Sequence, residues 1–288
     1  MKIHKLLIEN YKSISRIEID NPSPFSVFVG PNAAGKSNIF EALQFAISLS
    51  QYYGVDSVRA LGNFLPQNNE TRLPNFKAVL GELESAFTFT NQDTKTKAFS
   101  FTHFNFMQIG SKVATFGIGN YQEDPNYQQF YRGYSRLFIK NDDLDKRKDN
   151  DDFRLSLAAR NIEPVLKRVL SNSTKREELV EWLQLFIPGL VNIEVKSSDS
   201  GENDELLVYE SGNSKPFTKA LISDGTYNII SLLTVVLQSD TPQFLCIEEP
   251  ENGLNPKVVK ELVGFFREQC EANGHYIWLN THSQTLVG

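Results

Sequence analysis

One eight-residue stretch near the amino terminus constrains the fold of this chain more than any other feature. It follows the pattern G-x-x-x-x-G-K-S and consists of Gly30, Pro31, Asn32, Ala33, Ala34, Gly35, Lys36 and Ser37. The apolar run 25–29 before it is typical of a buried strand, and residues 37–50 after it have the periodicity of a helix. A strand, a glycine-containing loop and a helix in this order predict a phosphate-binding Walker A loop.

This loop predicts how a nucleoside triphosphate would be bound. Backbone N–H groups between Gly30 and Asn38 would face the phosphates, reinforced by the positive end of the following helix. Lys36 would reach the β- and γ-phosphates, and the Ser37 hydroxyl would hold Mg²⁺. ATP and Mg²⁺ are therefore the expected ligands of the chain.

Two acidic residues end a second apolar run, 244–247. Burying a strand that carries Glu248 and Glu249 at its end is costly unless a cation or a proton transfer uses them. At the carboxyl edge of a parallel sheet both would lie beside the Walker A loop. We predict that Glu248 holds Mg²⁺ and that Glu249 deprotonates the attacking water. A solvated Glu-Glu-Pro turn is the alternative interpretation.

Two further polar residues are candidates for the same site. The apolar run 276–279 leads to His282, which at a strand end beside the phosphates could hydrogen-bond the γ-phosphate or the water. Lys12 lies between two predicted strands, 3–8 and 14–19, and is a candidate for a nucleotide contact. The alternative for Lys12 is a solvated lysine of a turn.

Composition excludes several classes of protein. No apolar run approaches the roughly 20 residues that span a bilayer, and the amino terminus lacks the apolar region of a signal peptide. The two cysteines, Cys246 and Cys270, lack metal-ligand spacing. These features predict a cytoplasmic chain without a membrane partner. The formal net charge of −6 gives no compositional argument for nucleic-acid binding, which stays open as an alternative.

The rest of the chain predicts a division into three parts. We expect a P-loop ATPase core from 1–50 and 217–288, and an antiparallel β and loop insertion over 51–140. Residues 141–216 would form a charged linker, a helical segment and a hairpin leading back to the core. Within these parts the pattern predicts a loop at 63–74, strands over 78–119, helices at 153–170, 175–186 and 227–237, and a hairpin of 191–196 with 205–210.

Several of these motifs resemble a known family. The run Ile-Glu-Asn-Tyr-Lys-Ser at 8–13, the loop at 30–38, Ile-Glu-Glu-Pro-Glu-Asn-Gly-Leu-Asn-Pro at 247–256 and Asn-Thr-His-Ser at 280–283 resemble the ABC-type ATPase heads of the SMC, RecF and OLD proteins. The similarity is strongest to compact AAA-type ATPases of bacterial anti-phage systems such as PARIS and Septu. It implies an α/β P-loop NTPase with an ABC-type head: a mixed sheet core, an antiparallel β subdomain and a helical insertion.

The resemblance also implies roles for residues in the carboxy-terminal third. Ser223 and Gly225 stand where the family has its signature motif, which would contact the γ-phosphate held by the opposite subunit. Residues 252–255 would be the D-loop, and His282 the switch histidine. These roles imply a homodimer or higher oligomer closed by an ATP sandwich, with a separate effector protein as partner. A simple helix cap is the alternative for Ser223.

Departures from the family pattern affect these expectations. Glu248 replaces the usual Asp, so hydrolysis could be slow, and Ala33-Ala34 replaces a glycine and a small polar residue at the loop tip. The Q-loop glutamine has only Gln67 and Gln108 as candidates. Related ATPases commonly continue after the switch histidine, so we expect the 288 residues to be a fragment or a core that another chain completes.

The expected function is therefore that of an ATPase, ATP + H2O to ADP + phosphate, which acts as sensor or scaffold in anti-phage defence. A DNA-repair or chromosome-associated SMC- or RecF-like ATPase that contacts DNA directly is the first alternative. An ATP-gated scaffold without hydrolysis is the second. Kinase and transporter functions are less favoured, because the sequence has neither a kinase catalytic loop nor a transmembrane segment.

Overall fold

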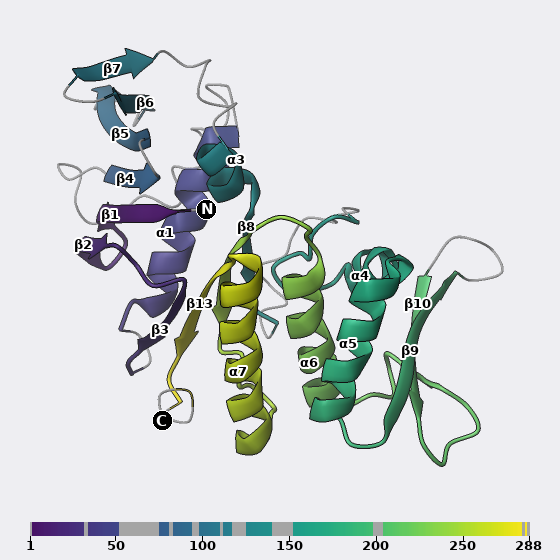
Figure 1. Cartoon of the computed structure of the whole chain (residues 1–288). Helices are drawn as coiled ribbons and strands as arrows, with labels where there is room; N and C mark the ends of the chain where they lie inside the picture. Colours follow the sequence, from purple (N-terminus) through teal and green to yellow (C-terminus); the bar gives the residue numbers. More distant parts are fainter. Residues whose placement is uncertain are drawn as a thin grey trace.

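The computed structural model describes residues 2–31, 34–51, 75–80, 83–93, 98–109, 112–116, 125–139, 152–197, 204–283 and 286. Within these ranges no helix has the length and apolar character needed to cross a membrane. The described residues form three sheets and two groups of helices, arranged side by side along the molecule (Figure 1).

A four-stranded parallel sheet lies at the centre. Its strands, in the order β3-β13-β12-β8, are β3 (Phe25–Val29), β13 (Tyr276–Thr281), β12 (Phe244–Glu248) and β8 (Tyr134–Leu137). All neighbouring pairs are parallel, so the carboxyl ends of the four strands meet at one edge. The predicted phosphate-binding strand β3 and the predicted acidic strand β12 therefore end at the same edge, with β13 between them.

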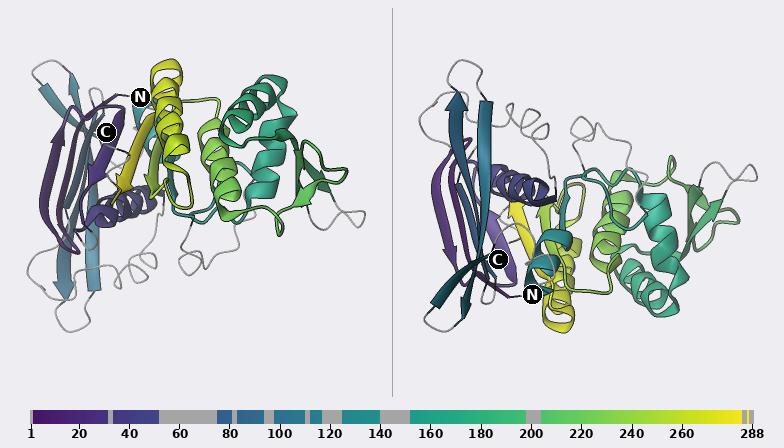
Figure 2. Two further views of the ribbon diagram at one scale, coloured as in Figure 1. Left: turned by 90° about the horizontal axis from the view of Figure 1, so that it is seen from below. Right: turned by 90° about the horizontal axis from the view of Figure 1, so that it is seen from above.

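An antiparallel sheet of six strands lies on one side of this centre (Figures 1 and 2). Its order is β2-β1-β4-β5-β6-β7, with β1 (Ile3–Tyr11), β2 (Ile14–Asp20), β4 (Asn75–Leu80), β5 (Leu83–Asp93), β6 (Ala98–Ile109) and β7 (Lys112–Phe116). The predicted amino-terminal strand pair and the later antiparallel strands are confirmed. One sheet thus contains strands from 1–20 and strands from 75–116. The division of the chain into three parts stays a prediction.

Helices cover both faces of the parallel sheet. On the side of the six-stranded sheet are α1 (Lys36–Gln51) and α3 (Pro125–Arg132). The other face carries α4 (Ile162–Ser171), α5 (Ser173–Phe186), α6 (Asp224–Leu237) and α7 (Pro256–Asn273). Beyond α5 lies a small antiparallel sheet of β9 (Leu190–Ser197), β10 (Asp204–Glu210) and β11 (Phe217–Thr218).

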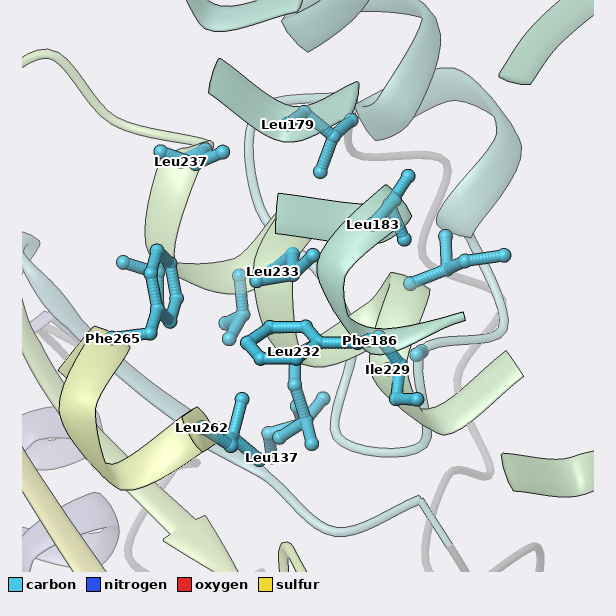
Figure 3. Packing of buried hydrophobic residues seen from close by; sticks show 14 of the residues in the cluster. Leu137, Leu179, Leu183, Phe186, Ile229, Leu232, Leu233, Leu237, Leu262 and Phe265 are labelled. Atoms are coloured by element: carbon cyan, nitrogen blue, oxygen red, sulfur yellow. The ribbon is translucent and has the colours of Figure 1, made fainter. Parts of the chain in front are cut away.

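Alternation along the central strands builds two separate cores. In β12, Phe244 and Cys246 face α1 and the six-stranded sheet, whereas Leu245 and Ile247 face the helices α4–α7. Successive side chains of a strand point to opposite faces of the sheet, so a strand covered on both faces contributes to both cores. Figure 3 shows the second core, in which leucines of α5 and α6 interdigitate with Leu262 and Phe265 of α7. The two cores pack against the sheet from both faces.

The start of α4 differs from the prediction. The sequence pattern predicts a helix from Phe153, but α4 begins at Ile162. Asn161 explains the difference, because its side chain accepts a bond from the Ser156 N–H at 2.7 Å and donates to the Arg154 carbonyl at 2.7 Å. These bonds close a turn that competes with the helix. Leu155 is buried in this turn, so its apolar character reflects packing without a helix.

A buried histidine lies at the other end of the parallel sheet. The Nδ1 atom of His275 accepts a bond from the Gln243 N–H at 3.0 Å, so the ring is neutral. Burial, with a smaller contribution from Lys175, lowers the pKa of His275 from 6.5 to about 4. The unfolded chain therefore takes up this proton at a higher pH than the folded chain does.

We expect the free energy of unfolding to fall as the pH is lowered from about 6.5 to about 4. The loss attributable to His275 is about 3 kcal/mol, because one pKa unit corresponds to about 1.4 kcal/mol. Urea unfolding at several pH values measures it. His275→Asn should flatten this part of the profile. Equal slopes for wild type and His275→Asn would contradict the assignment.

Candidate functional site

The carboxyl edge of the parallel sheet brings the two predicted motifs into direct contact. The Ser37 hydroxyl, at the start of α1, donates to Glu248 Oε2 at 2.5 Å, although 211 residues separate the two in sequence. Asn280 of β13 lies between them and donates through Nδ2 to Glu248 Oε2 at 3.0 Å. A hydroxyl from the start of α1, a carboxylate from the end of β12 and an amide from the end of β13 thus converge on one point.

One glycine of the Walker A loop has a backbone conformation that favours glycine. Gly35 has a φ of +82°, which a side chain would strain, and a Cβ there would lie 2.6 Å from Ser13 Oγ. Lys36 folds over the loop and donates to the carbonyls of Gly30 and Pro31 at 2.7 and 2.8 Å. Asn38 donates to Ser13 Oγ at 2.7 Å, which ties the helix to the β1–β2 connection. The predicted contacts of Asn32 and Ala33 lie outside the described residues.

The second acid, Glu249, is held apart from the first. Its φ of +46° is unusual for a residue with a side chain, and such strain is common at functional sites. Asn252 donates to Glu249 Oε2 at 2.8 Å, and His282 Nδ1 lies 3.2 Å from Glu249 Oε1. The structure therefore brings together Glu249, His282 and Asn252, a residue of the predicted D-loop.

Glu248 is buried together with an arginine. Only 2% of its side chain is exposed, and its Oε1 atom accepts from Nε of Arg136 at 2.6 Å and also from Nη2. Arg136 comes from β8, and 5% of its side chain is exposed. Burial opposes its charge, but Glu248 and the other neighbours outweigh burial and raise the pKa of Arg136. The pair is therefore a buried ion pair of β8 and β12.

Further residues extend this ion pair toward the β1–β2 connection. Gln44 accepts from Arg136 Nη1 at 2.9 Å, and Glu41 Oε1 lies 3.5 Å from Nη2. Glu41 in turn pairs with Lys12. The structure thus pairs Lys12 with Glu41, and its contact with a nucleotide stays a prediction.

Two cavities flank the site. One of about 500 Å³ is lined by the β1–β2 connection, the end of β3 and the loop residues Ala34, Gly35 and Lys36. The other, of about 590 Å³, lies between Glu248 and Glu249 on one side and Tyr227 and Asp224 of α6 on the other. Neither cavity is lined by both Lys36 and Ser223.

The predicted signature residues lie at the start of α6. Ser223 is exposed and caps the helix, because its hydroxyl accepts from the Thr226 N–H at 3.1 Å. Gly225 packs against the predicted D-loop: a Cβ at this position would lie 2.6 Å from the Gly253 carbonyl oxygen. Neither residue lines the cavity beside Lys36 of its own chain.

Sequence reasoning missed Arg136 and the role of Asn280 as a bridge. A signal for Arg136 existed, since it directly precedes the apolar run Leu137 to Ile139, and an arginine that is buried with such a run needs an acidic partner. For the Q-loop, Gln67 lies outside the described residues, and Gln108 belongs to β6 of the antiparallel sheet. Neither candidate is therefore placed at the site.

The donor chemistry fits Mg²⁺. Ser37 and Glu248 offer a hydroxyl and a carboxylate oxygen, which are the hard ligands that Mg²⁺ prefers. Among the described residues no group of three or more His, Cys, Asp or Glu side chains could hold a metal by itself. This suits a metal that is shared between one or two protein oxygens and the phosphates of a nucleotide.

Comparison with known proteins identifies the family. Residues 1–149 match the family described as "AAA ATPase domain", and residues 120–288 match "AAA domain, putative AbiEii toxin, Type IV TA system". An ATP/GTP phosphatase of Helicobacter pylori is 23% identical over 99% of this chain and 86% of its own length. The chromosome partition protein Smc of Methanocaldococcus jannaschii is 40% identical over 16% of this chain and 4% of its own length.

Solved structures confirm the predicted fold class. The Smc head bound to the C-terminal winged-helix domain of ScpA superposes with a TM-score of 0.55 at 14% identity, over 99% of this chain and 91% of that chain. The Smc head of Pyrococcus furiosus, bound to the C-terminal domain of ScpA, gives 0.54 at 12% identity, with the same coverage. The chain therefore belongs to the AAA ATPase domain family, and it is an ATPase with the P-loop fold of an SMC head.

Proposed function

We propose that the loop from Gly30 to Asn38 binds ATP and that Ser37 and Glu248 hold its Mg²⁺. The contact of 2.5 Å between Ser37 and Glu248 is the observation that carries this proposal. Both oxygens lie at the start of α1, where the helix dipole attracts phosphate. Lys36 would exchange its carbonyl partners for phosphate oxygens, which are stronger acceptors because they are charged. When bound, Mg²⁺ neutralises charge that develops on the phosphates.

Glu249 is the proposed general base. Its carboxylate would accept a proton from the water that attacks the γ-phosphate, and a positioned base of this kind contributes about 10²–10⁴-fold. Asn252 and His282 hold the two carboxylate oxygens in place. His282 would also contact the γ-phosphate or the water, as the sequence predicts. The extra methylene of Glu248 relative to Asp is consistent with slow hydrolysis.

We further propose that two copies close around ATP. Ser223 and Gly225 lie at the amino-terminal end of α6, where N–H groups attract an anion. They do not line the cavity beside Lys36 of the same chain, which supports their acting on the nucleotide of a partner copy. ATP would then be an interfacial ligand that stabilises the dimer by mass action.

The proposed biological role is that of sensor or scaffold in anti-phage defence, acting with a separate effector protein and resembling the ATPases of PARIS and Septu. A family description that names a toxin of a toxin–antitoxin system supports such a two-component role. A short stretch of similarity to a chromosome partition protein supports the alternative, an ATPase that contacts DNA directly. Phage plating on cells with the gene and its neighbours, with and without this chain, tests the first role.

Light scattering tests the nucleotide-dependent assembly. We expect a mass of one chain without nucleotide and of two chains or more with ATP and Mg²⁺. Phosphate release should accompany it, with GTP measured alongside because a relative is named for both nucleotides. ATP binding without phosphate release would favour the scaffold alternative. DNA binding whose affinity falls steeply with salt would favour the alternative of direct DNA contact.

A further inference from the structure

The carboxylate of Glu248 is saturated by bonds from its own chain. Arg136 donates to Oε1 through Nε and Nη2, whereas Ser37 and Asn280 donate to Oε2. An ionised carboxylate has about four acceptor positions, so these four donors fill it. A cation that is to use Glu248 must therefore displace one of these bonds.

The Arg136 guanidinium is the one full positive charge among these donors, and it is fixed in place. Its remaining N–H groups face Gln44 and Glu41 of α1, and only 5% of the side chain is exposed. A planar guanidinium held from α1 and β12 at once does not swing away as a lysine would. In this state the negative charge of Glu248 is already neutralised by the chain itself.

We propose that Arg136 is a positioning residue that neutralises Glu248 in the nucleotide-free chain, so that Mg²⁺ enters the site only together with ATP. This inference rests on the proposed function, in which Glu248 is a metal ligand. A neutralised carboxylate and one hydroxyl attract a dication weakly, whereas the triphosphate adds charge and oxygen ligands. Arg136 also orients the long Glu248 side chain, since it holds Oε1 and leaves Oε2 on Ser37.

The experiment measures metal binding without nucleotide. Wild type and Arg136→Met are titrated with Mn²⁺, and electron paramagnetic resonance measures the free ion. The Tm of each protein is then measured with and without Mg²⁺. We expect no binding by wild type, and one bound ion per chain in Arg136→Met. Mg²⁺ at about ten times its dissociation constant should then raise the variant's Tm by about 3 °C. Arg267→Met, which replaces an exposed arginine stacked on Phe25 of the same sheet, should behave as wild type.

A purely structural role of Arg136 predicts a different result. In that case Arg136→Met lowers the Tm by about 10 °C, because a buried ion pair is broken, but the variant binds metal no better than wild type does. That outcome would overturn the proposal. If Arg136→Met does not fold, Mg²⁺ or the second change Glu248→Gln must restore folding, because either removes the uncompensated charge. Failure of both would equally overturn it.

Metal binding with ATP separates this inference from the proposed function. If wild type binds MgATP but Arg136→Met does not bind the metal ion in the absence of ATP, only the role of Arg136 is refuted. If Ser37→Ala and Glu248→Gln bind ATP as tightly as wild type does, with the same dependence on Mg²⁺, the assignment of the metal ligands is refuted.

Discussion

Lys36→Ala is expected to weaken ATP binding by at least about 100-fold and to abolish hydrolysis. Two charge-assisted hydrogen bonds to phosphate contribute about 1.5–3 kcal/mol each, and the variant loses both. The fold should persist, because the Lys36 ammonium donates to the carbonyls of its own loop, Gly30 and Pro31. Calorimetric titration with ATP and Mg²⁺ measures the change directly.

The matched control is Lys167→Ala. Lys167 also has two polar partners, Ser197 and Asp204, but these lie on the small sheet of β9 and β10. Its loss should leave ATP affinity unchanged, since exposed ion pairs contribute at most about 1 kcal/mol and act locally. An ATP affinity of Lys36→Ala equal to that of the control would exclude the loop as the phosphate site.

The parts of the site that the sequence predicts are those with strong local signals. Glycine and lysine spacing identifies the loop at 30–37, and an apolar run that ends in two acids identifies Glu248 and Glu249. Both signals need only neighbouring residues. That they meet follows from a general rule, because carboxyl ends of parallel strands share one edge. The contact between Ser37 and Glu248 agrees with that rule.

The parts that the sequence does not predict depend on distant partners. The strand β8 has only four residues, and its membership in the parallel sheet comes from pairing with β12, more than a hundred residues later. The sequence around Arg136 therefore does not identify its partner, Glu248. The predicted start of α4 is wrong for a local reason. The Asn161 side chain hydrogen-bonds to backbone groups of Ser156 and Arg154, and hydrophobic periodicity does not reveal these bonds.

Glu249→Gln is expected to reduce hydrolysis by at least about 100-fold while ATP affinity stays unchanged. Glutamine is isosteric and can still accept from Asn252, so the strained turn at this position keeps its shape. ATP that is bound but not hydrolysed should then hold the dimer closed. Light scattering should show a mass of two chains with ATP and Mg²⁺ that persists for hours, whereas Glu261→Gln, an exposed change on α7, should behave as wild type.

Ser223→Arg should give the opposite result: ATP bound by each monomer, but no closed dimer and no hydrolysis. The cap that it removes from α6 contributes only about 1 kcal/mol, so loss of assembly cannot be explained by unfolding. Ser173→Arg, which places the same side chain at the exposed start of α5, controls for added bulk and charge. Hydrolysis by Ser223→Arg at the wild-type rate, or an oligomer independent of ATP in both Glu249→Gln and Ser223→Arg, would mean that Ser223 only caps its helix. The two variants together thus separate chemistry within one chain from closure between two.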